Sequence, residues 1–370
     1  MSTFTTLDSG FIAQNPARDD AAYYMAVGPR VVALPNGDVV CSYMRTRQTA
    51  TNDFVPCLAR STDGGKSWDA TGPIWPETID RLSIFASISR DTAGQLFVYG
   101  SRTPIETIGE AFWSDATQGL KQNELFWSSS PDGGRSWSGQ QPIAMQIAGS
   151  AEAPGPLCVT NDGAWLAPYS PYNTVDAAVK VDLGQVVALR SHDRGETWSS
   201  RSMIRFAEPQ SGGAEAWVIE LADGRLLATA WHLNLSGGPD HPNKFALSSD
   251  GGKSWTPARS TGILGQSTAL TALPDGRALF IYNQRKHGEA GVWIAVARPT
   301  EADFGVEANE IVWRAAQPTQ HGTAGDHAQW SDFSFGEPSA TILPDGTVLV
   351  ALWCLQPGGS GVAYVRLKLA

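Results

Sequence analysis

The sequence is poor in charged residues and in long hydrophobic runs, and its charge is not positive. Charged residues make up 17% of the chain and the formal net charge is −10, which argues against nucleic acid or an anionic membrane surface as the main partner. No apolar run approaches membrane-spanning length, and the N-terminal MSTFTTLDSG lacks the features of a signal peptide. We therefore expect a cytoplasmic protein with no nucleic-acid and no membrane partner.

Cysteine is also scarce. The four cysteines, Cys41, Cys57, Cys158 and Cys354, show no metal-binding CxxC spacing and lie inside apolar runs. Cys41 and Cys57 could be neighbours in one hairpin, but we favour buried free thiols. We expect no metal and no cofactor.

Helical periodicity is nearly absent. Fourteen tryptophans and 38 glycines accompany short runs of Val, Ile, Leu and aromatic residues, which alternate with clusters of Gly, Asp, Asn and Pro. This alternation is typical of an all-β protein.

A hairpin pattern recurs six times. Each copy has an apolar run, a turn with glycine and a second apolar run, as in RVVALPNGDVVCSY (30–43). The turn glycines, spaced by 52 to 70 residues, are Gly37, Gly94, Gly163, Gly224, Gly276 and Gly346. We expect tight turns with both central residues at positive φ. Six hairpins at this period predict a single domain over residues 1–370, a six-bladed β-propeller with four-stranded antiparallel blades.

The last unit lacks one strand. Only GVAYVRLKLA follows its hairpin, so we expect the N-terminal segment TFTTLDSGFIA to supply the missing outer strand and close the ring.

A second phrase occurs in the first four units. Its copies are STDGGKSW (61–68), SPDGGRSW (130–137), SHDRGETW (191–198) and SSDGGKSW (248–255). The Asp can accept backbone N–H bonds, the Gly can supply a left-handed residue, and the Trp can pack between blades. This is the Asp-box pattern, and here the chain resembles the sialidase (neuraminidase) superfamily. The resemblance implies a rim position with a structural role for these boxes, and a glycosidase acting on an oligosaccharide or glycoconjugate.

The starts of the inner strands should converge at one mouth of the central tunnel. The ionisable residues there are Arg30, Glu152, Glu215 and Glu337, with Trp217 beside them. They are candidate site residues, and structural ion pairs across the tunnel are the alternative.

The resemblance implies further roles. In sialidases the first inner strand opens with an arginine and the next loop carries the acid/base aspartate, which here match Arg30 and Asp53, with Arg45 in the same loop. A solvated loop carboxylate is the alternative for Asp53. Glu215 matches the glutamate that polarises the catalytic tyrosine. Arg285 stands where a further substrate arginine is expected, although a surface arginine would fit as well.

Two departures from the family pattern are informative. Trp231, followed by His232, replaces the second arginine that binds the substrate carboxylate, and Glu337 occupies the tyrosine's position. Sialic acid carries a carboxylate on its anomeric carbon, which would repel a carboxylate nucleophile. A sugar with a neutral anomeric centre would permit both changes. We therefore expect hydrolysis by a pair of carboxylates.

Six-bladed exo-arabinanases, which resemble sialidases in fold, use two glutamates from adjacent blades, and Glu152 and Glu215 occupy comparable places. We expect Glu215 to act as nucleophile or its stabiliser and Glu152 or Asp53 as general acid, with Glu337 close by. A closed funnel with one mouth favours action at a chain end.

Other functions stay open at this point. They are a true exo-sialidase, a non-catalytic carbohydrate-binding propeller, and a polysaccharide lyase with His232 as base. Four tryptophans expected near the mouth could stack on sugar faces or serve packing alone: Trp113, Trp217, Trp231 and Trp330. Trp231 and His232 are candidate substrate-binding residues. Loops at 232–245 and 318–335 should rim the pocket, and His321, Asp326 and His327 in the second loop match no strong metal motif. The oligomeric state is not indicated.

Overall fold

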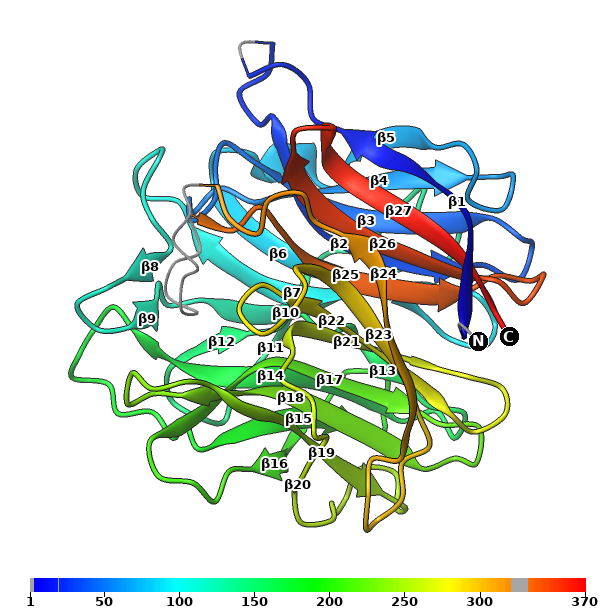
Figure 1. The fold of residues 1–370 in the computed structure, drawn as a ribbon. Coiled ribbons are helices and arrows are strands. Elements are labelled where there is room, and N and C mark those ends of the chain that lie inside the picture. The colour runs from blue at the N-terminus through cyan, green and yellow to red at the C-terminus, as the bar shows by residue number, and fades with distance from the viewer. Residues whose placement is uncertain (1–2, 19, 321–331) are drawn as a thin grey trace.

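The computed structural model describes residues 3–18, 20–320 and 332–370, and these form almost nothing but β-structure (Figure 1). Five sheets have four antiparallel strands each, and we name each blade after its inner strand. From the inner to the outer strand they are β2 (Met25–Ala33), β3 (Val39–Thr46), β4 (Val55–Ser61) and β5 (Asp69–Pro73); β6 (Leu82–Arg90), β7 (Leu96–Pro104), β10 (Glu124–Ser130) and β11 (Gln141–Ile143); β17 (Ser211–Glu220), β18 (Leu226–Asn234), β19 (His241–Ser248) and β20 (Arg259–Ser260); β21 (Gln266–Ala272), β22 (Ala278–Gln284), β23 (Gly291–Ala297) and β24 (Val306–Arg314); and β25 (Phe335–Ile342), β26 (Val348–Gln356), β27 (Gly359–Leu369) and β1 (Phe4–Gln14).

A further sheet of seven strands, which we call the large sheet, departs from the predicted four strands. Its members are β8 (Trp113–Ser114), β9 (Gly119–Leu120), β12 (Ser150–Glu152), β13 (Cys158–Val159), β14 (Trp165–Thr174), β15 (Gln185–Ser191) and β16 (Ser199–Arg205). Its inner edge is split into β12 and β13, which both pair with β14. The hairpin of β8 and β9 joins it as an addition. A short 3-10 helix, η1 (Pro76–Thr78), links β5 to β6.

The inner strands contact one another around a common axis. β2 contacts β6 and β25, β25 contacts β21, and β21 contacts β17. β13 and β14 of the large sheet lie between β17 and β6. The fold is therefore an all-β propeller with four-stranded antiparallel blades.

Face-to-face packing of the sheets explains why the strands are apolar on both sides. In β3, the neighbours Val39 and Val40 are both buried. Val39 packs with Leu349 of the β25 blade, whereas Val40 packs with Ile84 of the β6 blade. Because successive side chains of a strand point to opposite faces, each blade contributes to two cores.

The N-terminal strand pairs with the last strand of the chain. β1 pairs antiparallel with β27 from Phe4 opposite Leu369 to Gln14 opposite Gly361, so the first and last strands lie side by side (Figure 1). The last strands of the chain thereby gain an outer neighbour, and no edge of β27 is left open.

The six recurrent hairpins differ in one detail from the prediction. In the first, the Leu34 N–H donates to Asp38 O at 2.7 Å and the Gly37 N–H to Leu34 O at 3.0 Å. Gly37 has a φ of 90°, whereas Asn36 is not left-handed. The expected pair of positive φ values was wrong, because the turn is a type I turn followed by one left-handed glycine.

The repeated Asp residues hold turns between the two outer strands. In the first copy, the Asp63 carboxylate accepts the N–H groups of Lys66 and Ser67 at 3.0 and 2.9 Å and the Ser67 hydroxyl at 2.6 Å. The Trp68 indole donates to Gly65 O at 3.1 Å. Equivalent bonds surround Asp132, Asp193 and Asp250. These contacts confirm the structural role predicted for the aspartates.

Candidate active site

Four inner strands share one irregularity where they approach the axis. β2, β17, β21 and β25 each carry an extra residue relative to their partner strand, a β-bulge. A residue in each bulge is left-handed, with φ between 45° and 60°: Gly28, Glu215, Ser267 and Glu337. A positive φ is unfavourable for Ser and Glu, and such strain tends to cluster at functional sites. The bulge turns these residues out of the regular alternation of the strand.

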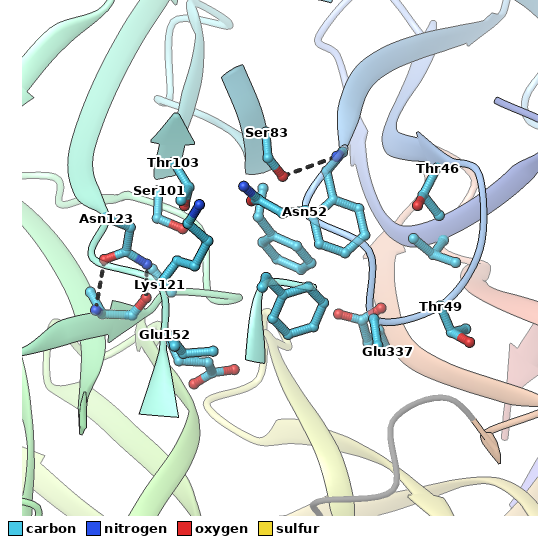
Figure 2. Close-up of a pocket in the computed structure, with 18 of the residues that line it drawn as sticks. Thr46, Thr49, Asn52, Ser83, Ser101, Thr103, Lys121, Asn123, Glu152 and Glu337 are labelled. Carbon is cyan, nitrogen blue, oxygen red and sulfur yellow. Dashed lines mark hydrogen bonds between the residues drawn. The ribbon is translucent and has the colours of Figure 1, made fainter. Parts of the chain in front are cut away.

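The bulges border a cavity of about 140 Å³ on the propeller axis. Three glutamates line it, and they come from separate sheets: Glu152 ends β12, Glu215 lies in β17, and Glu337 lies in β25. Figure 2 shows Glu152 and Glu337 reaching into this space from opposite sides. The convergence predicted for these three residues is therefore present in the structure.

Glu152 and Glu215 are linked directly. The backbone N–H of Glu215 donates to Glu152 Oε2 at 2.9 Å. Glu215 is only 4% exposed, and its Oε2 has no hydrogen-bond partner among the described residues. A buried carboxyl oxygen without a protein partner is costly and is suited to meet a ligand.

Burial shifts all three carboxyls in the same direction. It raises the pKa of Glu152 to about 8, assisted by the charge of Glu337. Burial, with Glu152 and Glu337 nearby, raises the pKa of Glu215 well above its ordinary value. Burial also raises the pKa of Glu337, but the charges of Arg30 and Arg285 oppose that shift. Glu337 is therefore the carboxyl with the strongest cationic support for its ionised form.

Arg285, which the resemblance places as a substrate arginine, is 6% exposed and lies on the cavity wall, so it is not a surface arginine. Its Nε and Nη2 donate to Phe335 O at 3.1 and 2.7 Å, and its guanidinium stacks 3.9 Å from the centre of the Phe333 ring. Nη1 has no hydrogen-bond partner among the described residues. Burial lowers its pKa to about 10, so the side chain stays cationic at neutral pH.

Arg30 does not line the cavity. Its Nε donates to Pro154 O at 2.9 Å, and its Nη1 donates to the carbonyls of Pro29 and Glu337 at 2.9 and 3.1 Å. These bonds tie the β2 blade to the large sheet and to the β25 blade. The structure thus places Arg30 as a brace behind the glutamates rather than as a residue that contacts substrate.

Asp53 is also turned away from the cavity. It is 1% exposed, accepts a hydrogen bond from the Thr46 hydroxyl, and forms an ion pair with Arg47 at 3.1 Å. Arg47 and Thr46 enclose its carboxylate. Asp53 is therefore neither at the predicted acid/base position in the cavity nor a solvated loop carboxylate. Arg45, expected nearby, donates to the carbonyl of Tyr24 at 3.2 Å and is not on the wall either.

The other predicted binding residues serve packing. Trp217 is 4% exposed and stacks against the Arg30 guanidinium at 5.5 Å. Trp231 is buried and donates to Asp240 at 3.2 Å. His232 is fully buried, bonded to the Ser211 hydroxyl at 2.9 Å, and burial lowers its pKa to about 4. None of the three contacts the axial cavity.

The sequence did not single out several residues of the wall. They include the aromatic rings of Phe54, Phe85, Phe112, Phe333 and Trp353, and the polar side chains of Asn52, Asn123 and Lys121. Figure 2 shows Lys121 and Asn52 on the side of the pocket near Ser83 and Thr103, away from Glu152 and Glu337. Both donate to Glu110 Oε1, at 2.8 and 2.7 Å. Phe85 lies near the start of the inner strand β6, and that position was the available signal. Lys121 and Phe112 belong to an insertion of the β6 blade whose path no local pattern predicts.

Metal ligands were not expected, and among the described residues no group of three His, Cys, Asp or Glu side chains could hold a metal ion. His321, Asp326, His327 and Trp330 lie outside those residues. Within the same ranges, no helix is long and apolar enough to cross a membrane. The cysteines there are free thiols, three buried and Cys158 partly buried.

The BNR repeat-like domain family matches this sequence over residues 111–314. This chain belongs to that family. A curated sialidase of Micromonospora viridifaciens is 26% identical over 374 residues, which cover 92% of this chain but only 51% of the relative. This BNR repeat-like chain therefore spans about half the length of that sialidase.

Solved structures share the fold. A protein of unknown function from Dyadobacter fermentans matches the whole of both chains with a TM-score of 0.76 and 20% identity. An α-L-arabinanase of Penicillium chrysogenum matches 98% of each chain with a TM-score of 0.58 and 17% identity. At these identities the likeness is one of fold alone.

Proposed function

We propose that this protein is an exo-acting glycoside hydrolase, which removes a terminal sugar from an oligosaccharide or glycoconjugate with a pair of carboxylates. The observation that carries the proposal is the meeting of Glu152, Glu215 and Glu337 in one axial cavity, two of them on left-handed backbone. Buried carboxyls of unequal environment are what glycosidic bond cleavage requires, because one must donate a proton while another is ionised. The small size of the cavity supports attack at a chain end.

The charges around each carboxyl support an assignment of roles. Glu152, with a pKa raised to about 8, is protonated at neutral pH and can act as the general acid. Glu337 has Arg30 and Arg285 nearby, so it is suited to be the ionised partner that attacks the anomeric carbon or activates water. Glu215 was expected from the sequence to be the nucleophile or its stabiliser. We assign it the role of stabiliser, and its backbone N–H orients Glu152.

A neutral anomeric centre is the substrate feature that we favour. Arg285 is the single arginine among the described wall residues, and no tyrosine occurs among them. A sialidase site of the kind expected from the resemblance needs three arginines and a tyrosine. An exo-α-sialidase is the alternative, supported by the curated sialidase relative. His232, the candidate base for a lyase, is enclosed away from the cavity.

We also propose that the large sheet is the sixth blade, and that residues 1–370 form a single domain. The cytoplasmic location expected from the sequence stays a prediction.

Glycosyl fluorides and unactivated glycosides of neutral sugars, uronic acids and sialic acid test the proposal. Glu337→Gln should lower kcat/KM by about 10²–10⁴-fold on both kinds of substrate. Glu152→Gln should cause a similar loss on unactivated glycosides and little loss on the fluoride, because fluoride leaves without a proton. This split separates the acid from the nucleophile or base.

Two control variants sharpen the test. Glu124→Gln changes an exposed glutamate on β10 and should leave the rate unchanged. Asp53→Asn should retain activity within about ten-fold, since its carboxylate faces Arg47 rather than the cavity. Absence of turnover on the whole panel, or near-normal activity of Glu337→Gln, would contradict the proposed mechanism, and turnover of the sialoside alone would favour the alternative.

A further inference from the structure

A second and larger cavity lies beside the axial one. It encloses about 610 Å³ and is bordered by Trp113, Tyr172, Asn173, the 212–213 segment and the 233–240 loop. Chain neighbours line both cavities: Phe112 the axial one and Trp113 the outer, Arg285 the axial one and Lys286 the outer. The two spaces therefore adjoin at the same end of the propeller, next to the glutamates.

The hairpin of β8 and β9 builds one wall of the outer cavity. It is held at both ends, since β9 pairs in parallel with β14 and Ala111 forms a bridge with Thr51 of the β2 blade. Gly119 permits the close approach to β14, because a Cβ there would lie 2.4 Å from Thr174 O. The hairpin is thus part of the framework of the propeller, and side chains on it are held at a defined distance from the axis.

Trp113 is the aromatic group of this wall. Its indole donates to Asp115 at 3.0 Å, and its ring packs edge-on against Tyr172 with centroids 6.3 Å apart. The ring is half-buried and borders the cavity. Side-chain amides of Gln118, Asn173 and Asn234 border the same space. An aromatic face with several amides beside it suits a sugar ring, which presents an apolar face and a rim of hydroxyls.

One buried cluster borders both cavities, since Leu120 lines the axial one and Tyr172 and Leu233 line the outer one. It contains Leu120, Tyr172, Ala214, Trp231 and Leu233. On its axial side lie the three glutamates, and on its outer side no glutamate is found among the described lining residues. Asp240, the carboxylate among the described lining residues of the outer cavity, accepts hydrogen bonds from the Trp231 indole and the Asn234 N–H, each at 3.2 Å. The glutamates of the axial cavity are therefore the candidates for bond cleavage.

We propose that the outer cavity is a leaving-group subsite, which binds the neutral sugar unit next to the scissile bond with Trp113 as its stacking platform. The proposal rests on the proposed function, because it places the cleaved bond between the two cavities. It adds that the enzyme selects disaccharides or longer chains over substrates without a second sugar.

The test compares two substrates with the same terminal sugar, a disaccharide and a glycosyl fluoride, which has no second ring. Trp113→Ala should lower kcat/KM about ten-fold for the disaccharide, as expected for a lost stacking contact, and less than about two-fold for the fluoride. Trp113→Phe should restore most of the disaccharide rate. Trp293→Ala, which alters a partly buried indole on β23 away from both cavities, is the matched control.

Calorimetric titration of the Glu337→Gln variant with the free disaccharide and monosaccharide repeats the comparison without turnover. Weaker disaccharide binding after Trp113→Ala, with monosaccharide binding unchanged, supports the subsite even if no substrate is hydrolysed. Equal effects on both ligands, no effect on either, or no disaccharide binding would overturn it. If none of the substrates is hydrolysed but disaccharide binding still depends on Trp113, the proposed hydrolase function is refuted and the subsite stands.

Discussion

Carboxylates at the rim and at the axis of this propeller have opposite electrostatic environments. At the rim, hydrogen bonds from Ser254 and Ser248 lower the pKa of Asp250 to about 2. At the axis, burial raises the pKa of Glu152 to about 8. Both groups accept backbone N–H bonds, so hydrogen bonding by itself does not distinguish them. The difference lies in solvent, which stabilises the rim charge and is largely excluded from the axis.

The two regions also differ in where their partners come from. Asp250 is bonded by residues within four positions of itself. Glu152 receives the N–H of Glu215 and experiences the charge of Glu337, which belong to other sheets. A rim turn can therefore form from a short segment, whereas the axial site exists only when the ring is closed.

Opening the ring should have the largest effect and should affect both regions. Removal of residues 1–15 deletes β1, exposes the edge of β27 and uncovers its apolar side chains. We expect the melting temperature to fall by more than about ten degrees and activity to be lost. Differential scanning calorimetry checks this. Unchanged melting would show that β1 does not close the structure.

Glu152→Gln should reveal the axial environment through the pH dependence of stability. Because the folded pKa of Glu152 is raised to about 8, its contribution to stability is complete below its unfolded pKa and is lost as pH rises through about 8. We expect wild type and variant to melt alike near pH 5, and the variant to melt several degrees higher near pH 8.5. Equal melting at both pH values would contradict the buried, protonated state.

Asp250→Asn should give the smallest effect, and the opposite dependence on pH. The folded pKa of Asp250 is lowered, so its contribution is present above the unfolded pKa and is lost as pH falls through about 2. We expect the free energy of unfolding to fall by about 1 kcal/mol relative to wild type at neutral pH. The difference should become smaller in acid, and catalytic rates should be unchanged. A large loss of activity in this variant would contradict a purely structural rim.

Local sequence signals were reliable wherever the partners are close in the chain. The turn glycines and the Asp boxes specify their own hydrogen bonds, and their period along the chain predicted the propeller. The same signals predicted that Glu152, Glu215 and Glu337 would meet, and the structure places each of them within an inner strand rather than ahead of it. The family resemblance was less reliable, because it predicted substrate and acid/base roles for Arg30 and Asp53, and neither side chain lines the axial cavity.

By itself, the sequence determined the all-β class, the hairpin period, the rim turns and the convergence of three glutamates, because each follows from local backbone preferences repeated along the chain. Tertiary structure alone decided which side chains reach the cavity. Arg30 is turned away by Pro154 O of the large sheet, and Lys121 and Phe112 are brought to the cavity wall by an insertion between β7 and β10. Such placements depend on packing between distant segments, which no short stretch of sequence specifies.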